Sequence, residues 1–152
     1  MKTLTLTAIL AVALAGSAAA QMQHAQGMDH RGHQAMGWDQ SKAKHTFATA
    51  DNGGSIEVKA NDPNDAMTVA AIRSHLAEIA RSFTAGDFDK PQFIHAQTPP
   101  GVPEMKRLKA DITYTYQDMH AGGKVTIASA NPDAIKAVHD FLKFQGTEHA
   151  GK

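Results

Sequence analysis

The apolar residues between positions 45 and 152 follow a pattern that occurs twice. Residues 46–49 and 55–58 alternate apolar with polar side chains, as half-buried strands do, and residues 51–54 between them favour a turn. Apolar residues then recur at three- and four-residue steps, which is typical of a helix: Val69, Ile72, Leu76, Ile79 and Phe83. The first copy is therefore strand, strand, helix. We expect Pro63 to open this helix and Gly86 to close it.

The second copy repeats this order further along the chain. Its strand positions are Ile112, Tyr114, Tyr116, Val125 and Ile127, with Gly122 and Gly123 turning the chain between them. Its helix positions are Ile135, Val138, Phe141 and Leu142. Asn131 is expected to cap this helix and Gly146 to stop it.

Two ββα units predict an α+β fold for residues 45–152. Their hairpins can join into one antiparallel sheet with both helices on one face. The segment that connects the units, residues 87–105, is long, and we expect it to be a loop stiffened by four prolines, at positions 91, 99, 100 and 103.

Residues 1–20 have the form of a signal peptide. Lys2 supplies the positive start, residues 4–15 are apolar but too few to span a bilayer, and residues 18–20 are three alanines. We expect cleavage after Ala20, a mature chain that begins at Gln21, and a periplasmic or secreted protein. With no cysteine to carry a lipid and no spanning segment, we expect no membrane anchor.

Residues 21–44 are expected to form a flexible tail. They are rich in Gly, Gln, Met and His and contain hardly any aliphatic side chains, so they bury too little apolar area to offset the entropy of ordering. Trp38 is the one large apolar side chain there and is able to dock on the domain.

The composition narrows the classes of partner. With 15 basic and 15 acidic residues the formal net charge is zero, which argues against nucleic acid as a partner. The chain has no cysteine but contains nine histidines and seven methionines. These ligands bind metals without forming disulfides in an oxidising compartment.

Six of these ligands lie within fifteen residues of the tail: Met22, His24, Met28, His30, His33 and Met36. Thioether sulfur is a soft donor suited to Cu(I), and imidazole suits copper in both oxidation states. Zinc gains little from thioethers, and Mg²⁺ or Ca²⁺ require oxygen ligands. The tail therefore predicts exchangeable capture of Cu(I) or Cu(II). The other interpretation is a polar linker that has this composition by chance.

A second set of candidate ligands is spread over the domain: His45, His75, His95, Met105 and His139. His45 shares its strand face with Phe47, and His75 and His139 flank the apolar stripes of the two helices. If the proline-rich loop folds over the helices, His95 or Met105 meets His75 or His139 in an imidazole–thioether site. Alternatively, each is a hydrogen-bonded residue at the edge of the core. We expect His120 and His149 to be solvated.

Signatures of catalysis are missing from the sequence. Residues 121–124 lack the upstream Gly and the following Ser or Thr of a phosphate-binding loop. No serine has the surroundings of a nucleophile elbow, and there is no cysteine nucleophile. We therefore expect a protein that is not an enzyme.

The domain resembles a family of short exported proteobacterial proteins of unassigned function. The motifs that carry the resemblance span most of residues 45–149: His45-Thr46-Phe47, residues 51–54, 56–58, 72–76 and 86–88, Ile94-His95, residues 99–102, 138–145, and Glu148-His149. The family pattern includes His45, His75, His95 and His139. Some members carry the label aspartate carbamoyltransferase, which this chain does not support, because it is about half the length and lacks that enzyme's Ser-Thr-Arg-Thr phosphate motif.

These observations lead to a first hypothesis and two alternatives. The first is a periplasmic copper-binding protein for copper capture, homeostasis or delivery, with the copper ion and another exported copper protein as partners. The second is an exported module that binds a ligand or a protein and has no metal role. The third is a copper-dependent redox enzyme.

Overall fold

The computed structural model describes the backbone of residues 7–150 and the side chains of residues 20–150. The helices are α1 (Thr7–Met36), α2 (Ala66–Ala85), α3 (Asp89–His95), α4 (Val102–Arg107) and α5 (Pro132–Glu148). The strands are β1 (Ala43–Ala50), β2 (Gly53–Ala60), β3 (Ile112–Met119) and β4 (Gly122–Ser129). Short 3-10 turns precede β1 and β3, at Gln40–Lys42 and Lys109–Asp111.

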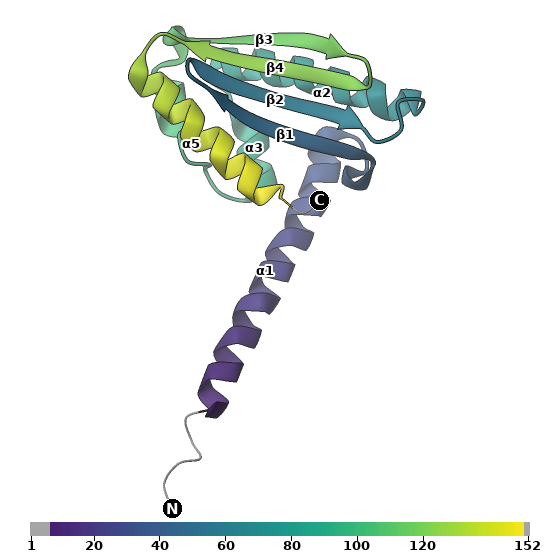
Figure 1. Cartoon of the computed structure of the whole chain (residues 1–152), viewed down its shortest axis with the longest axis vertical. Coiled ribbons are helices and arrows are strands. Elements are labelled where there is room, and N and C mark those ends of the chain that lie inside the picture. The colour runs from purple at the N-terminus through teal and green to yellow at the C-terminus, as the bar shows by residue number, and fades with distance from the viewer. Residues whose placement is uncertain (1–6, 151–152) are drawn as a thin grey trace, which may run out of the picture.

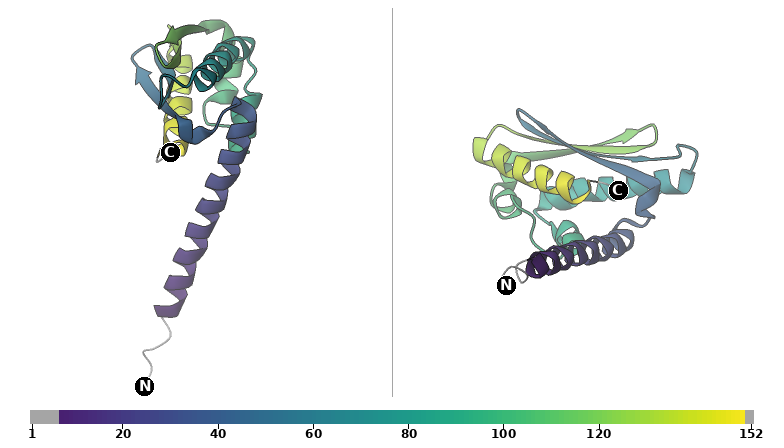
Figure 2. Two further views of the ribbon diagram at one scale, coloured as in Figure 1. Left: turned by 90° about the vertical axis from the view of Figure 1, so that its right-hand side faces the viewer. Right: turned by 60° about the horizontal axis from the view of Figure 1, so that its bottom comes forward.

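The four strands form one antiparallel sheet in the order β1-β2-β4-β3. The two hairpins join through β2 and β4, where Ile56 pairs with Val125. Helices α2 and α5 lie on the same face of this sheet (Figures 1 and 2). The predicted α+β fold of two ββα units, with both helices on one face, is confirmed.

Helices α2 and α5 each pack mainly on the hairpin of the other unit. Helix α2 follows β1 and β2 but lies chiefly against β3 and β4, whereas α5 follows β3 and β4 and lies chiefly against β1 and β2. Between them the Phe83 ring contacts three other aromatic rings, those of Phe88, Tyr114 and Phe141. The two units therefore share one hydrophobic core.

The ends of α2 and α5 follow the predicted signals in part. Gly86 closes α2 with φ of 81°, a conformation that glycine adopts at little cost, and Asn131 caps α5. Pro63 does not open α2, because Asp65 is its cap. Gly146 does not stop α5, which continues to Glu148. The buried stripe of α5 extends to Gln145, and its packing outweighs the roughly 1 kcal/mol that an interior glycine costs.

The connecting segment is not the structureless loop that we expected. It contains α3 and α4, whose buried side chains Ile94, Val102 and Met105 attach it to the rest of the domain. Gly101 allows α4 to approach α5 closely, because a Cβ at this position would lie 2.0 Å from the carbonyl oxygen of Ala137.

Residues 21–36, expected to be part of a flexible tail, form the second half of α1. This part of the helix lies against α3 as an incomplete third layer (Figure 2). The exposed fractions of Met28, Met36 and Trp38 are 2%, 8% and 4%. Nε of Arg31 also donates to the Ile94 carbonyl at 2.9 Å. Three apolar anchors thus supply the buried area that a count of aliphatic residues did not reveal.

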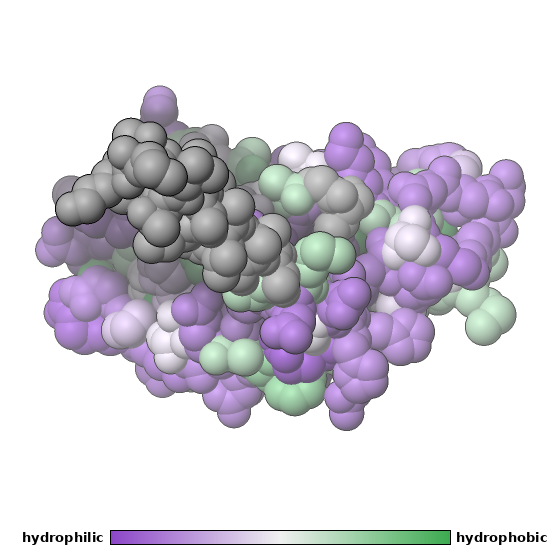
Figure 3. Space-filling model, turned by 90° about the horizontal axis from the view of Figure 1, so that it is seen from below, coloured by the Kyte–Doolittle hydropathy of each residue, from purple (hydrophilic) through white to green (hydrophobic). Residues whose placement is uncertain are grey.

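The expected signal peptide falls partly outside the described residues. Residues 1–6 are not described, and residues 7–20 form the beginning of α1, which extends away from the sheet (Figure 1). Among the described helices, none has both the length and the apolarity to cross a membrane. Seen from below, the molecular surface mixes hydrophilic side chains with separate hydrophobic areas (Figure 3).

Candidate metal centre

A small cavity lies between the β1–β2 hairpin and the helices α2, α3 and α5, beside the end of α1. Its volume is about 50 Å³, enough for a few water molecules or an ion. Most of its wall is aliphatic or aromatic. Its polar and sulfur-bearing lining residues are Met36, His45, His75, Lys90, Gln145 and His149.

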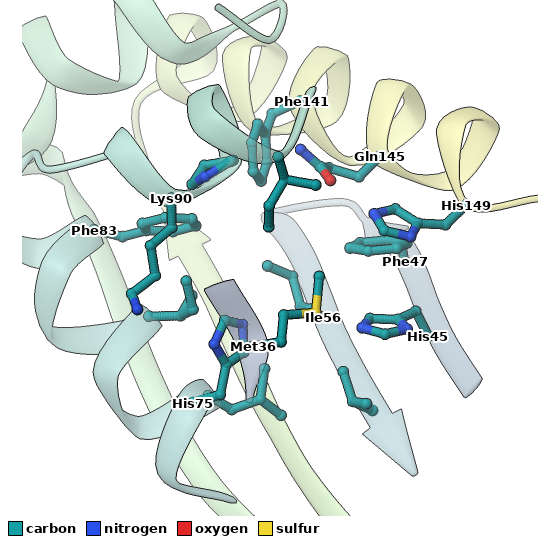
Figure 4. Close-up of a pocket in the computed structure, with 15 residues that line it drawn as sticks. Met36, His45, Phe47, Ile56, His75, Phe83, Lys90, Phe141, Gln145 and His149 are labelled. Atoms are coloured by element: carbon teal, nitrogen blue, oxygen red, sulfur yellow. The ribbon is translucent and has the colours of Figure 1, made fainter. Parts of the chain in front are cut away.

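Three candidate ligands meet at this cavity from three different elements. Met36 is the last residue of α1, His45 belongs to β1 and His75 to α2. Figure 4 shows Met36 between His75 on one side and His45 on the other. His45 reaches the cavity because it shares the inward face of β1 with Phe47, as the alternation predicted.

The His75 ring is a neutral imidazole over the ordinary pH range. Burial lowers its pKa to about 3, and the positive charges of Lys90 and His45 contribute further. The Lys90 charge is partly balanced, because its Nζ lies 3.1 Å from Oε2 of Glu78. A neutral imidazole keeps the lone pair that a metal requires.

Trp38 lies against the imidazole rings of His45 and His75. Its ring centroid is 6.2 Å from that of His45, with the planes nearly parallel, and 5.4 Å from that of His75, edge to face. Because Trp38 is the only tryptophan in the chain, its fluorescence reports on this place alone.

His95 lies deeper and makes structural contacts. It is 1% exposed, its Nε2 donates to Oε1 of Gln145 at 2.9 Å, and its ring packs on Phe144. Its Nδ1 lies 3.8 Å from Oε2 of Glu148, and the same oxygen is 2.9 Å from Nε2 of His24 on α1. This carboxylate thus connects α1, α3 and α5.

The remaining candidates do not line the cavity. Met22, His24, His30 and His33 are exposed along α1, whereas Met28 and Met105 are packed in the core. His139 donates from Nε2 to the Ala50 carbonyl at 2.9 Å and so joins α5 to the end of β1. The structure therefore divides the tail ligands between two faces of a helix, and neither His95 nor Met105 meets His75 or His139 in the expected site.

His149, which we expected to be solvated, belongs to the candidate centre. It is partly buried, and its ring contacts those of His45, Phe47 and His95. It continues the buried stripe of α5, four residues after Gln145. Extending the helical periodicity past Gly146 would have revealed it.

The side chains are not closed around a metal position. Among the described residues, no group of three or more His, Asp or Glu side chains is arranged to hold a metal ion. The cavity brings together a thioether and imidazoles instead, and the stacked rings of His45 and His149 present their faces to each other. Coordination by both rings would require one of them to turn.

The buried amide of Gln145 adds a polar group to the cavity wall. Its Oε1 accepts from His95, while its Nε2 is buried and has no hydrogen-bond partner among the described residues. A buried donor of this kind calls for an acceptor such as water. The cavity is thus suited to a small polar occupant.

Comparison of the chain with protein-family models, with curated proteins and with solved structures finds no match, and it supplies no family from which a function could be transferred.

Proposed function

We propose that the protein binds copper as Cu(I) in this cavity, with Met36, His45 and His75 as ligands, and that it serves copper capture, homeostasis or delivery. The observation that carries the proposal is the meeting of one thioether and two imidazoles, from three elements, at one small cavity. Thioether sulfur favours Cu(I), and His75 is already in the neutral form that binds metal.

The charge of the ion is the second argument. The energy needed to bury an ion rises with the square of its charge, so a monovalent ion is the less costly occupant of a mainly apolar cavity. The nearby Lys90 charge acts in the same direction, because it repels a divalent ion more strongly than a monovalent one.

The size of this cavity argues against an organic ligand as its occupant. Pockets for organic ligands measure about 300–1,000 Å³, whereas this cavity measures about 50 Å³.

The segment that we expected to be a flexible tail has a changed role in the proposal, because Met36 enters the cavity and Met28 packs in the core. Export to the periplasm or medium, and delivery to another exported copper protein, remain part of the proposal.

Substitutions that remove one donor at a time test it. We expect Met36→Leu, His45→Phe and His75→Phe each to weaken Cu(I) binding by about tenfold or more, measured by competition with a chromogenic Cu(I) chelator under reducing conditions. Met105→Leu and His120→Phe are the matched controls, since they remove a buried thioether and an exposed imidazole elsewhere. They should change the affinity by less than about threefold.

Two results would contradict the proposal. One is a folded protein that takes up no Cu(I) at micromolar concentration, which would favour the metal-free binding module. The other is binding that survives all three cavity substitutions and is lost in a His30→Ala/His33→Ala double variant, which would move the site to the exposed face of α1.

A further inference from the structure

Two hollows of the molecule share a wall. One is the cavity of about 50 Å³, and the other is a larger groove of about 360 Å³ between β1 and the end of α5. Three aromatic rings line both hollows: those of His45, Phe47 and His149. In Figure 4 these three rings lie together on one side of the cavity, so they stand between the cavity and the groove.

His149 is the one ring of this wall that lies at a helix end and not in a paired strand. His45 and Phe47 belong to a strand that is paired with β2, where they face Val58 and Ile56. His149 instead follows the last residue of α5, and its backbone N–H donates to the Gln145 carbonyl at 3.0 Å. Helix ends open at a smaller free-energy cost than paired strands in a core do.

The ring of His149 is also in the position needed for a transfer. Its centroid lies 5.1 Å from that of His45 and 5.4 Å from that of Phe47. An ion that leaves water for an apolar cavity needs a donor at every step, because an uncoordinated charge there is strongly unfavourable. Of the three rings of the wall, only the imidazoles supply such donors.

We propose that His149 is a transfer ligand, which takes the copper ion from the groove and passes it to His45 and Met36 in the cavity. This inference rests on the copper-binding function proposed above. The step is a ligand exchange without a redox change. A nitrogen lone pair of the His149 ring replaces a water molecule on the ion, and the donors of the cavity then replace His149.

The proposal predicts that His149 affects the rates of metal exchange but hardly affects the equilibrium affinity for the metal. In His149→Phe the wall keeps an aromatic ring but loses the donor. We expect the rates of metal association and of release to a chelator both to fall by about tenfold, while the equilibrium affinity changes by less than about threefold. Stopped-flow fluorescence of Trp38 with silver(I), a soft monovalent substitute for Cu(I), measures both rates. His120→Phe is the control and should leave them unchanged.

A second variant distinguishes a transfer ligand from a simple plug. His149→Ala removes both the ring and the donor. A transfer ligand predicts slower exchange in this variant also, whereas a plug predicts faster exchange. Faster exchange in His149→Ala, or unchanged rates in His149→Phe, would overturn the proposal while copper binding itself stands. A wild-type protein that binds neither silver(I) nor Cu(I) would overturn both proposals.

Discussion

A single neutral histidine links the candidate site to the stability of the fold. The pKa of His75 is lowered from 6.5 to about 3, mainly by burial. In the unfolded chain the same ring has its ordinary pKa and takes up a proton first as the pH falls. The contribution of His75 to stability is therefore complete above about pH 6.5 and is lost as the pH falls towards 3.

Substitution of His75 should flatten the pH dependence of stability. Between pH 7 and pH 5 the unfolding free energy of the wild-type protein should fall by up to about 2 kcal/mol on account of this ring, and His75→Phe should lack that part of the decrease. Urea unfolding at the two pH values measures the difference. His120→Phe should behave as the wild type, and an equal slope in His75→Phe would refute the expectation.

The sequence predicted some residues of the candidate site for reasons that hold in the structure. His45 and His75 were found because strand alternation and helix spacing fix the direction of a side chain. Such local patterns do not show which residues from distant parts of the chain come together at one site. Met36 meets these histidines only through the packing of α1 on α3, and no local pattern places an N-terminal residue beside β1 and α2. His149 was missed because we expected Gly146 to end α5, whereas the buried stripe of this helix continues past Gly146.

At the scale of elements, α1 is the main difference from expectation. Low aliphatic content predicted a flexible tail, yet Met28, Gly32 and Met36 follow one another at four-residue steps and are all buried. That spacing is helical, and a methionine buries about as much apolar surface as a leucine. Composition averaged over the segment hid a pattern that its individual positions contain.

Two methionines of α1 test this packing. Met28→Ala should lower the unfolding free energy by about 2 kcal/mol, because Met28 is 2% exposed. Met22→Ala should leave it unchanged within about 0.5 kcal/mol, because Met22 is 64% exposed. Urea unfolding followed by circular dichroism measures both. If the two variants are equally stable, residues 21–36 do not pack on the domain as described.

At the scale of the whole molecule, the exchange of helices makes the two ββα units depend on each other. The repeated pattern predicted the order of elements, the sheet and the common face of the helices. It did not predict that α2 covers the second hairpin and α5 the first. The sequence of one unit shows only that its helix has an apolar face, and both hairpins offer a matching surface.

Cutting the chain once, between Gln97 and Thr98 in the exposed segment that joins α3 to α4, tests this dependence. We expect neither fragment to show a cooperative unfolding transition alone, because each would expose the face that the other helix covers. Mixed in equal amounts, the fragments should regain the circular dichroism spectrum of the intact chain. A fragment that unfolds cooperatively by itself would show that one unit is sufficient for folding.

The exchange of helices also sets the moment at which the chain is able to fold. The first hairpin acquires its covering helix only with residues 132–148, which follow the second hairpin in the chain. A nascent chain therefore lacks a closed core until residues 132–148 have been made, although domains often fold while their chains are still growing. Until then the face of β1 and β2 that α5 covers is exposed to solvent.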